Sequence, residues 1–276
     1  MQALQDIATR VYQSAREADG ADGWGEDQDP AAVRDALIVP EPDPLPDCPL
    51  CRNFRKIRLD VEVGDPRFGK LFDCPKCAPH LEHQRQQRRW AQLAPRLDQY
   101  GIIPRADATF ESFNLGGRSE SVRKAFDSSL RFAELSGVWL VLYGESGTGK
   151  THLAMAVANA VRARRQTCLL ATVPGWLDLL KSGFDSGDFE ELMDLSLKAD
   201  YLIFDDLGTQ KATDWAYERL FHVLNTRYNE RKPVLITMNL VPSVLDMRLS
   251  SRMMDKTLCK IIHVVDSDYR PQKGAR

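Results

Sequence analysis

The stretch "LYGESGTGKTHLAMAVANA", residues 142–160, runs from an apolar strand end through a glycine-rich turn into a helix. The turn matches the pattern G-x-x-x-x-G-K-[ST] at every position, in the strand–turn–helix context that the pattern requires. The matching residues are Gly144, Glu145, Ser146, Gly147, Thr148, Gly149, Lys150 and Thr151. Backbone N–H groups of such a loop surround phosphates, the lysine places a cation at the outer phosphates, and the threonine hydroxyl coordinates Mg²⁺. The stretch therefore predicts a bound nucleoside triphosphate with its Mg²⁺.

A pair of carboxylates ends another apolar run, "YLIFDD" at residues 201–206. A phosphate-binding loop needs a carboxylate on a neighbouring strand for its metal, and we assign this role to Asp205. Asp206 is then placed to orient or deprotonate an attacking water. On their own the two aspartates are equally well explained as a capping turn, but together with Lys150 and Thr151 they favour the metal site.

The fold class follows from the alternation of apolar runs and helical patterns in the C-terminal two thirds of the chain. Strands are expected at 139–144, 167–173, 201–206, 233–239 and 259–265. Helices are expected at 149–164, 174–182 and 212–229. This alternation predicts an α/β fold with a parallel sheet flanked by helices on both faces. Cys168 and Cys259 fall in strand runs and are expected to be buried core thiols.

Beyond these two motifs, the order and spacing of several stretches resemble the AAA+ ATPases. They are more closely similar to the bacterial and phage helicase-loader group, DnaC and DnaI, with the related IstB transposition helpers. The stretches that carry the resemblance are "GESGTGKTHLA", "YLIFDDLGTQKATDWAYERLFHVLNTRY", "KPVLITMNL", "RLSSRM" and "DSDYR". They are distributed over residues 105–276. The resemblance implies a P-loop AAA+ domain with a reduced or absent lid, and ATP as the nucleotide.

The resemblance also implies roles for four further side chains. Asn239 matches the first sensor, a polar group that reads the γ-phosphate and holds the water. Arg252 matches the arginine finger that completes the site of a neighbouring subunit, with Arg248 as its rival. Arg270 matches the second sensor of the same subunit. On physical grounds alone, a solvated surface charge is the better explanation of each arginine.

One position departs from the pattern of these ATPases, and another follows it. Many members have Glu where this chain has Asp206, one methylene shorter, so hydrolysis is expected to be slow or stimulated by a partner. His152 follows the loop as it does in the loaders and is grouped with the nucleotide-binding residues, although its expected part is packing rather than chemistry.

A cysteine module precedes the ATPase-like part of the chain. Two Cys-x-x-Cys pairs contribute Cys48, Cys51, Cys74 and Cys77. Four thiolates bind Zn²⁺ tetrahedrally and can organise a module that lacks a hydrophobic core, so we expect a structural zinc. A redox dithiol is the competing interpretation, but neither pair lies in a βαβ context. His80 and His83 lie near enough to replace one cysteine.

Composition shifts suggest five segments. They are an amphipathic helix at 1–18, an acidic and Pro-rich linker at 19–47, the zinc-binding module at 48–80, a basic helical connector at 81–104 that Pro95 interrupts or kinks, and the AAA+ ATPase domain at 105–276. Residues 1–47 carry eleven acidic and three basic side chains, whereas residues 48–105 carry twelve basic and six acidic ones. The basic middle segment suits nucleic acid or an acidic protein surface, and plain solubility explains it equally well.

Nucleic acid and protein partners are both suggested by the N-terminal third. Arg85, Arg88, Arg89 and Trp90 combine charge with an aromatic ring, which suits single-stranded DNA, although a solvated connector is an equal alternative. The residues around the knuckles, Arg52, Arg55, Lys56, Arg58 and Arg67, could grip phosphates. The chain has no leader-like start and no run of apolar residues long enough to span a membrane, so we expect a cytoplasmic protein.

Three functions are compatible with these features. The first is an ATP-dependent loader that places a replicative hexameric helicase on single-stranded DNA, held through the zinc module and the tethered helix and acting as an ATP-dependent homo-oligomer. The second is an IstB-like transposition helper that binds duplex DNA. The third is a nucleotide-gated adaptor without catalytic turnover, which the short Asp206 side chain keeps open.

Overall fold

The computed structural model describes residues 47–208 and 213–268. The helix predicted at 1–18, most of the linker predicted at 19–47, and Arg270 lie outside these residues. Within them the chain divides into two compact units, with the boundary between Ala91 and Gln92. Of the described residues, the larger unit contains those from Gln92 onward.

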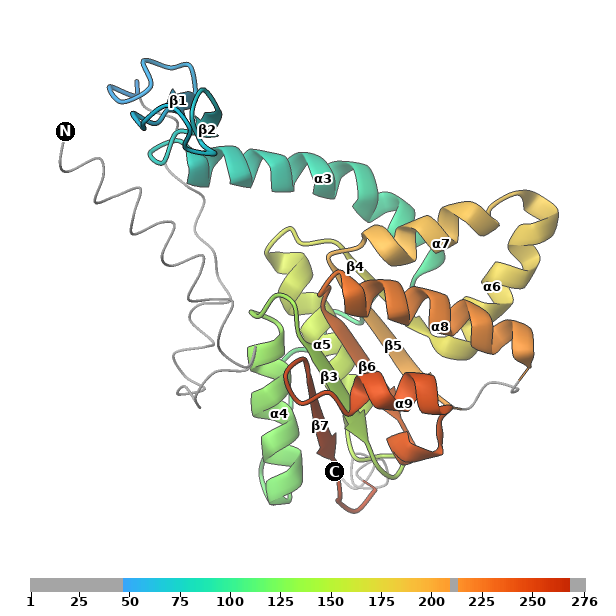
Figure 1. Cartoon of the computed structure of the whole chain (residues 1–276). Coiled ribbons are helices and arrows are strands. Elements are labelled where there is room, and N and C mark those ends of the chain that lie inside the picture. Colours follow the sequence, from blue (N-terminus) through green and yellow to red (C-terminus); the bar gives the residue numbers. More distant parts are fainter. Residues whose placement is uncertain (1–46, 209–212, 269–276) are drawn as a thin grey trace. The chain divides into compact units, whose positions relative to one another are not determined.

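A five-stranded parallel sheet forms the centre of the larger unit (Figure 1). Its strands are β3 (Trp139–Tyr143), β4 (Cys168–Thr172), β5 (Tyr201–Leu207), β6 (Val234–Met238) and β7 (Cys259–His263). Their spatial order is β4-β5-β6-β3-β7, and every neighbouring pair is parallel. All five strands predicted from the sequence are confirmed, with ends that differ by one or two residues.

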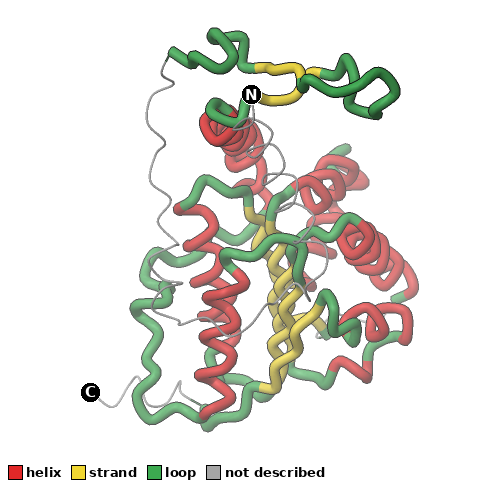
Figure 2. The backbone as a smooth tube through the Cα atoms, turned by 60° about the vertical axis from the view of Figure 1, so that its left-hand side comes forward, coloured by secondary structure: helices red, strands yellow, loops and turns green. Residues whose placement is uncertain are grey.

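Helices cover both faces of this sheet (Figure 2). One face packs against α4 (Glu120–Phe132) and α5 (Lys150–Ala163), and the other against α6 (Val173–Ser186), α7 (Phe189–Lys198), α8 (Asp214–Asn229) and α9 (Met247–Met253). Alternation along β3 supplies both cores, since Leu140 and Leu142 point to the first face, and Trp139 and Val141 to the second. The predicted α/β class is therefore confirmed.

Three helices of this unit were not predicted, namely α4, α7 and α9. The first begins after Ser119, whose hydroxyl accepts a hydrogen bond from the Val122 N–H, and it buries Val122, Phe126 and Leu130 against the sheet. A 3₁₀ turn, η1 (Pro242–Val244), precedes α9. The three helices that were predicted are present as α5, α6 and α8.

Helix α3 (Ala78–Tyr100) runs through Pro95 without a break, so the prediction that Pro95 could interrupt it is wrong. Tertiary contacts on the C-terminal turns explain this outcome. Leu97 is buried in the core, and Asp98 accepts two hydrogen bonds from Arg162 at 2.6 and 3.0 Å. These contacts offset the backbone hydrogen bond that a proline removes from a helix.

The smaller unit contains a short antiparallel hairpin, β1 (Lys56–Arg58) and β2 (Leu71–Asp73). Its interior consists of the four buried cysteines, against which Leu50, Ile57 and Leu81 pack. Among the helices of the described residues, none is long and apolar enough to cross a membrane.

Candidate nucleotide-binding site and four-cysteine centre

The glycine-rich loop connects β3 to α5 at the carboxyl end of the sheet. Two of its glycines are required by geometry. Gly144 has φ +144°, and a Cβ there would collide with the Val264 carbonyl. Gly149 has φ +101° and lies directly before α5, where a Cβ would come within 3.0 Å of the Phe113 ring. The loop can therefore take this shape only with glycine at these positions, and it leads into a helix N-terminus.

Lys150 and Thr151 are the first residues of α5. The Lys150 side chain contacts the loop, and the Thr151 side chain contacts β5. Lys150 is only 6% exposed, and its Nζ donates to the carbonyls of Gly144 and Glu145, each at 2.7 Å. Thr151 Oγ1 donates to the Asp205 carboxylate, 3.0 Å from Oδ2. Oxygen ligands at adjacent corners of a Mg²⁺ octahedron lie about 2.9 Å apart, so this pair fits that ion.

The Asp205 carboxylate is buried at the end of β5 and is held by hydroxyl groups. Thr237 Oγ1, on the adjacent strand β6, donates to Asp205 Oδ1 at 2.5 Å. Burial raises the pKa of Asp205, and the hydrogen bonds from Thr237 and Thr151 oppose this shift. A divalent cation at these oxygens would offset the same burial penalty.

A β-bulge separates the roles of the two aspartates. The pairing of β5 with β6 shifts register between Phe204 and Leu207, and Asp206 adopts φ +60°. Its backbone N–H donates to Thr237 Oγ1 at 3.0 Å, while its side chain accepts from Asn239 Nδ2 at 2.9 Å. The bulge therefore sends Asp205 toward Thr151 and Asp206 toward Asn239.

A cleft of about 600 Å³ contains these groups. Of the predicted site residues, it is lined by Ser146, Gly147, Gly149, Lys150, Thr151, His152, Asp205, Asp206 and Asn239. They come together because β6 lies between β3 and β5, so the carboxyl ends of the three strands meet. A cleft of this size, with polar groups at one end and Phe113 and Met155 in its wall, is suited to a small organic anion.

The wall of the cleft is held in place by α5. His152 Nε2 lies 3.1 Å from the Thr109 carbonyl and 3.4 Å from Ser112 Oγ, and its ring meets Phe113 edge-on. Asn159 Nδ2 donates to the carbonyls at residues 105 and 108. These contacts agree with the expected packing part of His152.

Thr237 and Arg118 are among the side chains of the cleft that sequence reasoning missed. Arg118 precedes α4, donates to the Thr148 carbonyl at 2.7 Å, and pairs with Asp266 at 2.8 Å. Burial by itself raises the pKa of Asp266, but hydrogen bonds from Arg118 and from two backbone N–H groups outweigh it and lower the value. The loop is thus tied to the segment that follows β7, through partners far apart in the sequence.

Arg252 and Arg248 do not line the cleft. Both lie on α9, with their guanidinium groups 4.8 and 4.6 Å from the centre of the Phe221 ring. Asn225 Oδ1 accepts from Arg252 Nε at 3.0 Å and from Nη2. Arg248 is the more exposed of the two and pairs with Glu218 at 3.3 Å. Arg252 is thus the more buried of the two, although aromatic rings and polar partners hold both side chains.

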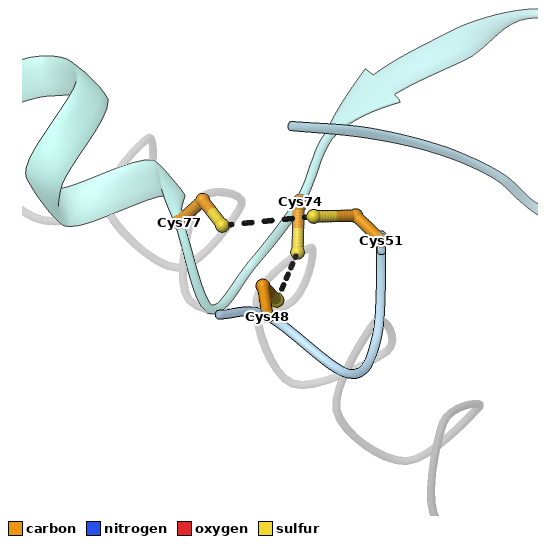
Figure 3. A group of neighbouring side chains, drawn as sticks. All are labelled: Cys48, Cys51, Cys74 and Cys77. Atoms are coloured by element: carbon orange, nitrogen blue, oxygen red, sulfur yellow. Dashed lines mark hydrogen bonds between the residues drawn. The ribbon is translucent and has the colours of Figure 1, made fainter. Parts of the chain in front are cut away.

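The four predicted cysteines converge in the smaller unit (Figure 3). Their sulfur atoms all lie within 4.8 Å of one another, and the Cys48–Cys74 and Cys51–Cys77 pairs are 3.7 Å apart. A tetrahedral Zn²⁺ with about 2.3 Å bonds requires sulfur separations of about 3.8 Å, so the cluster fits zinc. His83 instead lies against Gln87, 2.7 Å away.

The surroundings of the cluster act in opposite directions on its thiols. Backbone hydrogen bonding at Cys51 lowers the pKa of Cys48 to about 6, whereas burial raises the pKa of Cys77 to about 11. Arg55 Nη1 donates to Cys77 Sγ at 3.5 Å and places a positive charge beside it. Cys168 and Cys259 are buried in strands, as predicted, and take no part in the cluster.

Comparison with known proteins gives three kinds of similarity. The family described as IstB-like ATP binding protein matches residues 80–275. Uncharacterized protein YqaM of Bacillus subtilis is 30% identical over 174 residues, which are 58% of this chain and 53% of that protein. The replicative helicase loader DnaI of the same organism is 24% identical over 180 residues, 64% of this chain and 56% of that protein. The chain thus spans about half the length of these curated relatives.

Solved structures share the fold of the larger unit. A crystal structure of DnaI superposes with a TM-score of 0.51 at 25% identity, over 60% of this chain and 96% of that one. The replication initiator DnaA bound to AMPPCP and single-stranded DNA gives 0.55 at 23% identity, over 61% of this chain and 53% of that one.

Proposed function

This chain belongs to the IstB-like ATP-binding protein family, and from that premise we propose that it is an AAA+ ATPase of DNA replication that loads a helicase. The observation that carries the ATPase part is the convergence of Lys150, Thr151, Asp205, Asp206 and Asn239 in one cleft. Loop amides, an ammonium group and a pair of oxygen ligands are the groups that a nucleoside triphosphate with Mg²⁺ requires.

Each residue of the cleft has a proposed part. Lys150 and the loop amides bind the β- and γ-phosphates, and Thr151 with Asp205 holds Mg²⁺, which neutralises charge on those phosphates when bound. Asp206 orients or deprotonates the attacking water, and Asn239 fixes the Asp206 carboxylate for that task. Because Asp206 is shorter than Glu, we expect slow turnover that a partner or DNA stimulates.

The proposed oligomer supplies the remaining charge. Arg252 of one subunit stabilises the developing charge at the site of the next, and the order imposed by Asn225 makes it a better candidate than Arg248. Arg270, proposed as second sensor, lies outside the described residues. Zn²⁺ at the four cysteines has a structural part and keeps the smaller unit folded.

Helicase loading is supported by two observations taken together. The similarity to DnaI covers most of the solved DnaI chain, and a four-cysteine module precedes the ATPase unit in this sequence. We therefore propose a replicative hexameric helicase and single-stranded DNA as partners.

The test is the mass, by light scattering after gel filtration, of the full chain mixed with the replicative helicase of its source organism. ATP, ADP and no nucleotide are compared, with Lys150→Ala as the variant that should not bind nucleotide. Loading is supported if the wild type forms a stable complex whose amount depends on the nucleotide. The variant should behave alike with ATP, with ADP and without nucleotide. Absence of a complex in every state contradicts it.

The family description favours a second candidate, an IstB-like transposition helper. Preference for duplex over single-stranded DNA, with ATP-dependent filaments, would select this function instead. An adaptor without turnover is the third, and Asp206→Asn distinguishes it, because an adaptor would still deliver its partner without hydrolysis.

A further inference from the structure

The smaller unit presents two aromatic rings to solvent. Phe54 is 80% exposed and Phe68 is 52% exposed, although this unit has few apolar side chains with which to build an interior. A phenylalanine left in water by a unit that is short of apolar side chains is a candidate for binding rather than for folding.

Both rings are held on ordered turns. Phe54 follows the first knuckle, where its N–H donates to the Cys51 carbonyl at 2.9 Å. Phe68 lies in the loop that joins β1 to β2, and successive turns shape this loop through bonds from Asp65 N to Glu62 O, Phe68 N to Asp65 O, and Lys70 N to Arg67 O. The Arg67 guanidinium grips Asp65 with two further bonds, at 2.9 and 2.7 Å. The loop therefore displays Phe68 in a defined position.

Positive charge predominates in the unit that carries these rings. Residues 47–91 contain ten basic and six acidic side chains. Two of the acidic side chains already form ion pairs within the unit. Asp65 pairs with Arg67, and Asp73 pairs with Lys56 and Arg85. The exposed cations of the unit include Arg52, Arg58, Lys70, Lys76 and Arg88.

The hairpin register places one of these cations on the face turned away from the cysteines. Ile57 packs against the cysteine cluster, so its neighbour Arg58 lies on the opposite face, paired with Leu71. Solvated rings and cations on a small hairpin are the groups that bind unstacked bases and their phosphates.

We propose that the four-cysteine unit binds single-stranded nucleic acid, with Phe54 and Phe68 stacking on bases and Arg58 and Lys70 contacting phosphates. A duplex fits less well, because its bases are already stacked and offer no free face to a ring. This activity is separate from nucleotide hydrolysis and from any contact with a helicase. It gives the smaller unit a ligand of its own.

Fluorescence anisotropy of a labelled dT20 oligonucleotide tests the proposal with the full, zinc-loaded chain and no nucleotide. Phe54→Ala with Phe68→Ala should weaken binding by roughly tenfold or more, the loss expected when stacked rings are removed. Val63→Ser is the matched control, since Val63 lies in the same loop, is 85% exposed and has no ring. It should bind dT20 as the wild type does, and affinity in both should fall steeply with salt.

A second measurement distinguishes binding at Phe54 and Phe68 from binding of DNA by the ATPase unit. Photocrosslinking of wild-type protein to dT20 that contains 5-iodouracil, followed by mass spectrometry, should place crosslinks in peptides that contain Phe54 or Phe68. The proposal is overturned if crosslinks fall only within residues 92–268, or if the double variant retains wild-type affinity. Loss of affinity in Val63→Ser equal to that of the double variant also overturns it, since it would indicate a general apolar face. The helicase mixture contains no DNA, so the two proposals can fail independently.

Discussion

Asp205 carries a charge that the fold disfavours. Its carboxylate is almost fully buried, and burial raises its pKa from 3.8. A raised pKa means that the folded protein binds the proton more tightly than the unfolded chain does, so the ionised carboxylate costs stability at neutral pH. The ionised Asp205 carboxylate therefore lowers the stability of the fold, and a cation bound beside it would offset this loss.

Replacement of Asp205 by Asn should remove that cost together with the function. We expect the Tm of the nucleotide-free variant to rise by about 2–4 °C, the shift that on the order of 1 kcal/mol gives in a domain of this size. Mg²⁺ should raise the Tm of the wild type but not of the variant, and ATP turnover should disappear. Differential scanning calorimetry with and without Mg²⁺ checks this; a fall in Tm would contradict it.

Thr237 offers a second prediction at this scale. Its hydroxyl accepts from Asp206 N–H and donates to Asp205, so Thr237→Val leaves both groups without this partner at nearly constant volume. We expect kcat for ATP to fall by about 10- to 100-fold, while KM stays within about threefold, because the hydroxyl positions carboxylates rather than nucleotide. Thr237→Ser retains the hydroxyl and should recover most of the rate. Equal losses in both variants would exclude this role.

Among the secondary-structure elements, α8 depends on one buried guanidinium. Arg227 is fully buried and donates to five carbonyls, those of Ser196, Leu197, Ala199, Asp200 and Pro233. These carbonyls belong to the end of α7 and to the segments before β5 and β6. One side chain thus joins three elements to α8.

Arg227→Met should therefore be strongly destabilising. The methionine fills most of the space but leaves the carbonyls without donors, and we expect a loss of about 3–5 kcal/mol in the free energy of unfolding. Urea denaturation measures it. Arg231→Met, at an exposed position just after the end of α8, is the control and should change stability by less than about 0.5 kcal/mol.

We expect the junction of α4 with the end of β7 to lose stability in acid. The pKa of Asp266 lies below 3.8 in the folded protein, so its contribution is present above that pH and is lost as the pH falls through the folded value. Asp266→Asn should cost about 2 kcal/mol at pH 7, the order expected for a buried charged hydrogen bond. The difference from wild type should shrink as the pH is lowered toward 3. Urea titrations at a series of pH values check it, and a constant difference would argue against an ionised Asp266.

Local patterns in the sequence were enough to predict the phosphate loop, the acidic strand end and the cysteine cluster. The phosphate loop, the "YLIFDD" strand end and the cysteine pairs are contiguous motifs, and the structure brings each set together. Helix α4 could also have been predicted from the sequence, because Val122, Phe126 and Leu130 have helical spacing, but we did not predict it. Thr237 and Arg118 are different. Thr237 contacts Asp205 and Asp206 because of a bulge in the neighbouring strand. Arg118 pairs with Asp266, 148 residues away, so neither residue has a local sequence signal.

For the whole molecule, the two units should lose structure separately. The smaller unit has the cysteine cluster in place of a hydrophobic core, whereas the larger unit has two extensive cores of its own. Units built in this way do not depend on the same interactions for stability.

Cys74→Ser, or removal of zinc by a chelator, should unfold the smaller unit alone. We expect proteolytic cleavage within residues 47–91, while fluorescent ATP analogues bind with a Kd within about twofold of wild type, because no cysteine of the cluster lines the cleft. Limited proteolysis and a nucleotide titration measure the two effects, with Cys168→Ala as the control that leaves the cluster intact. Resistance of residues 47–91 to protease after chelation would contradict the zinc proposal.

The contact of the phosphate loop with the end of β7 can form only late in biosynthesis. Val264 lies against Gly144, and Arg118 bridges Thr148 to Asp266, so the loop near the middle of the chain takes its shape from residues made more than a hundred positions later. These residues leave the ribosome after the loop does. Nascent chains stalled before residue 266 should therefore fail to be retained on immobilised ATP, even though every residue of the loop has already emerged.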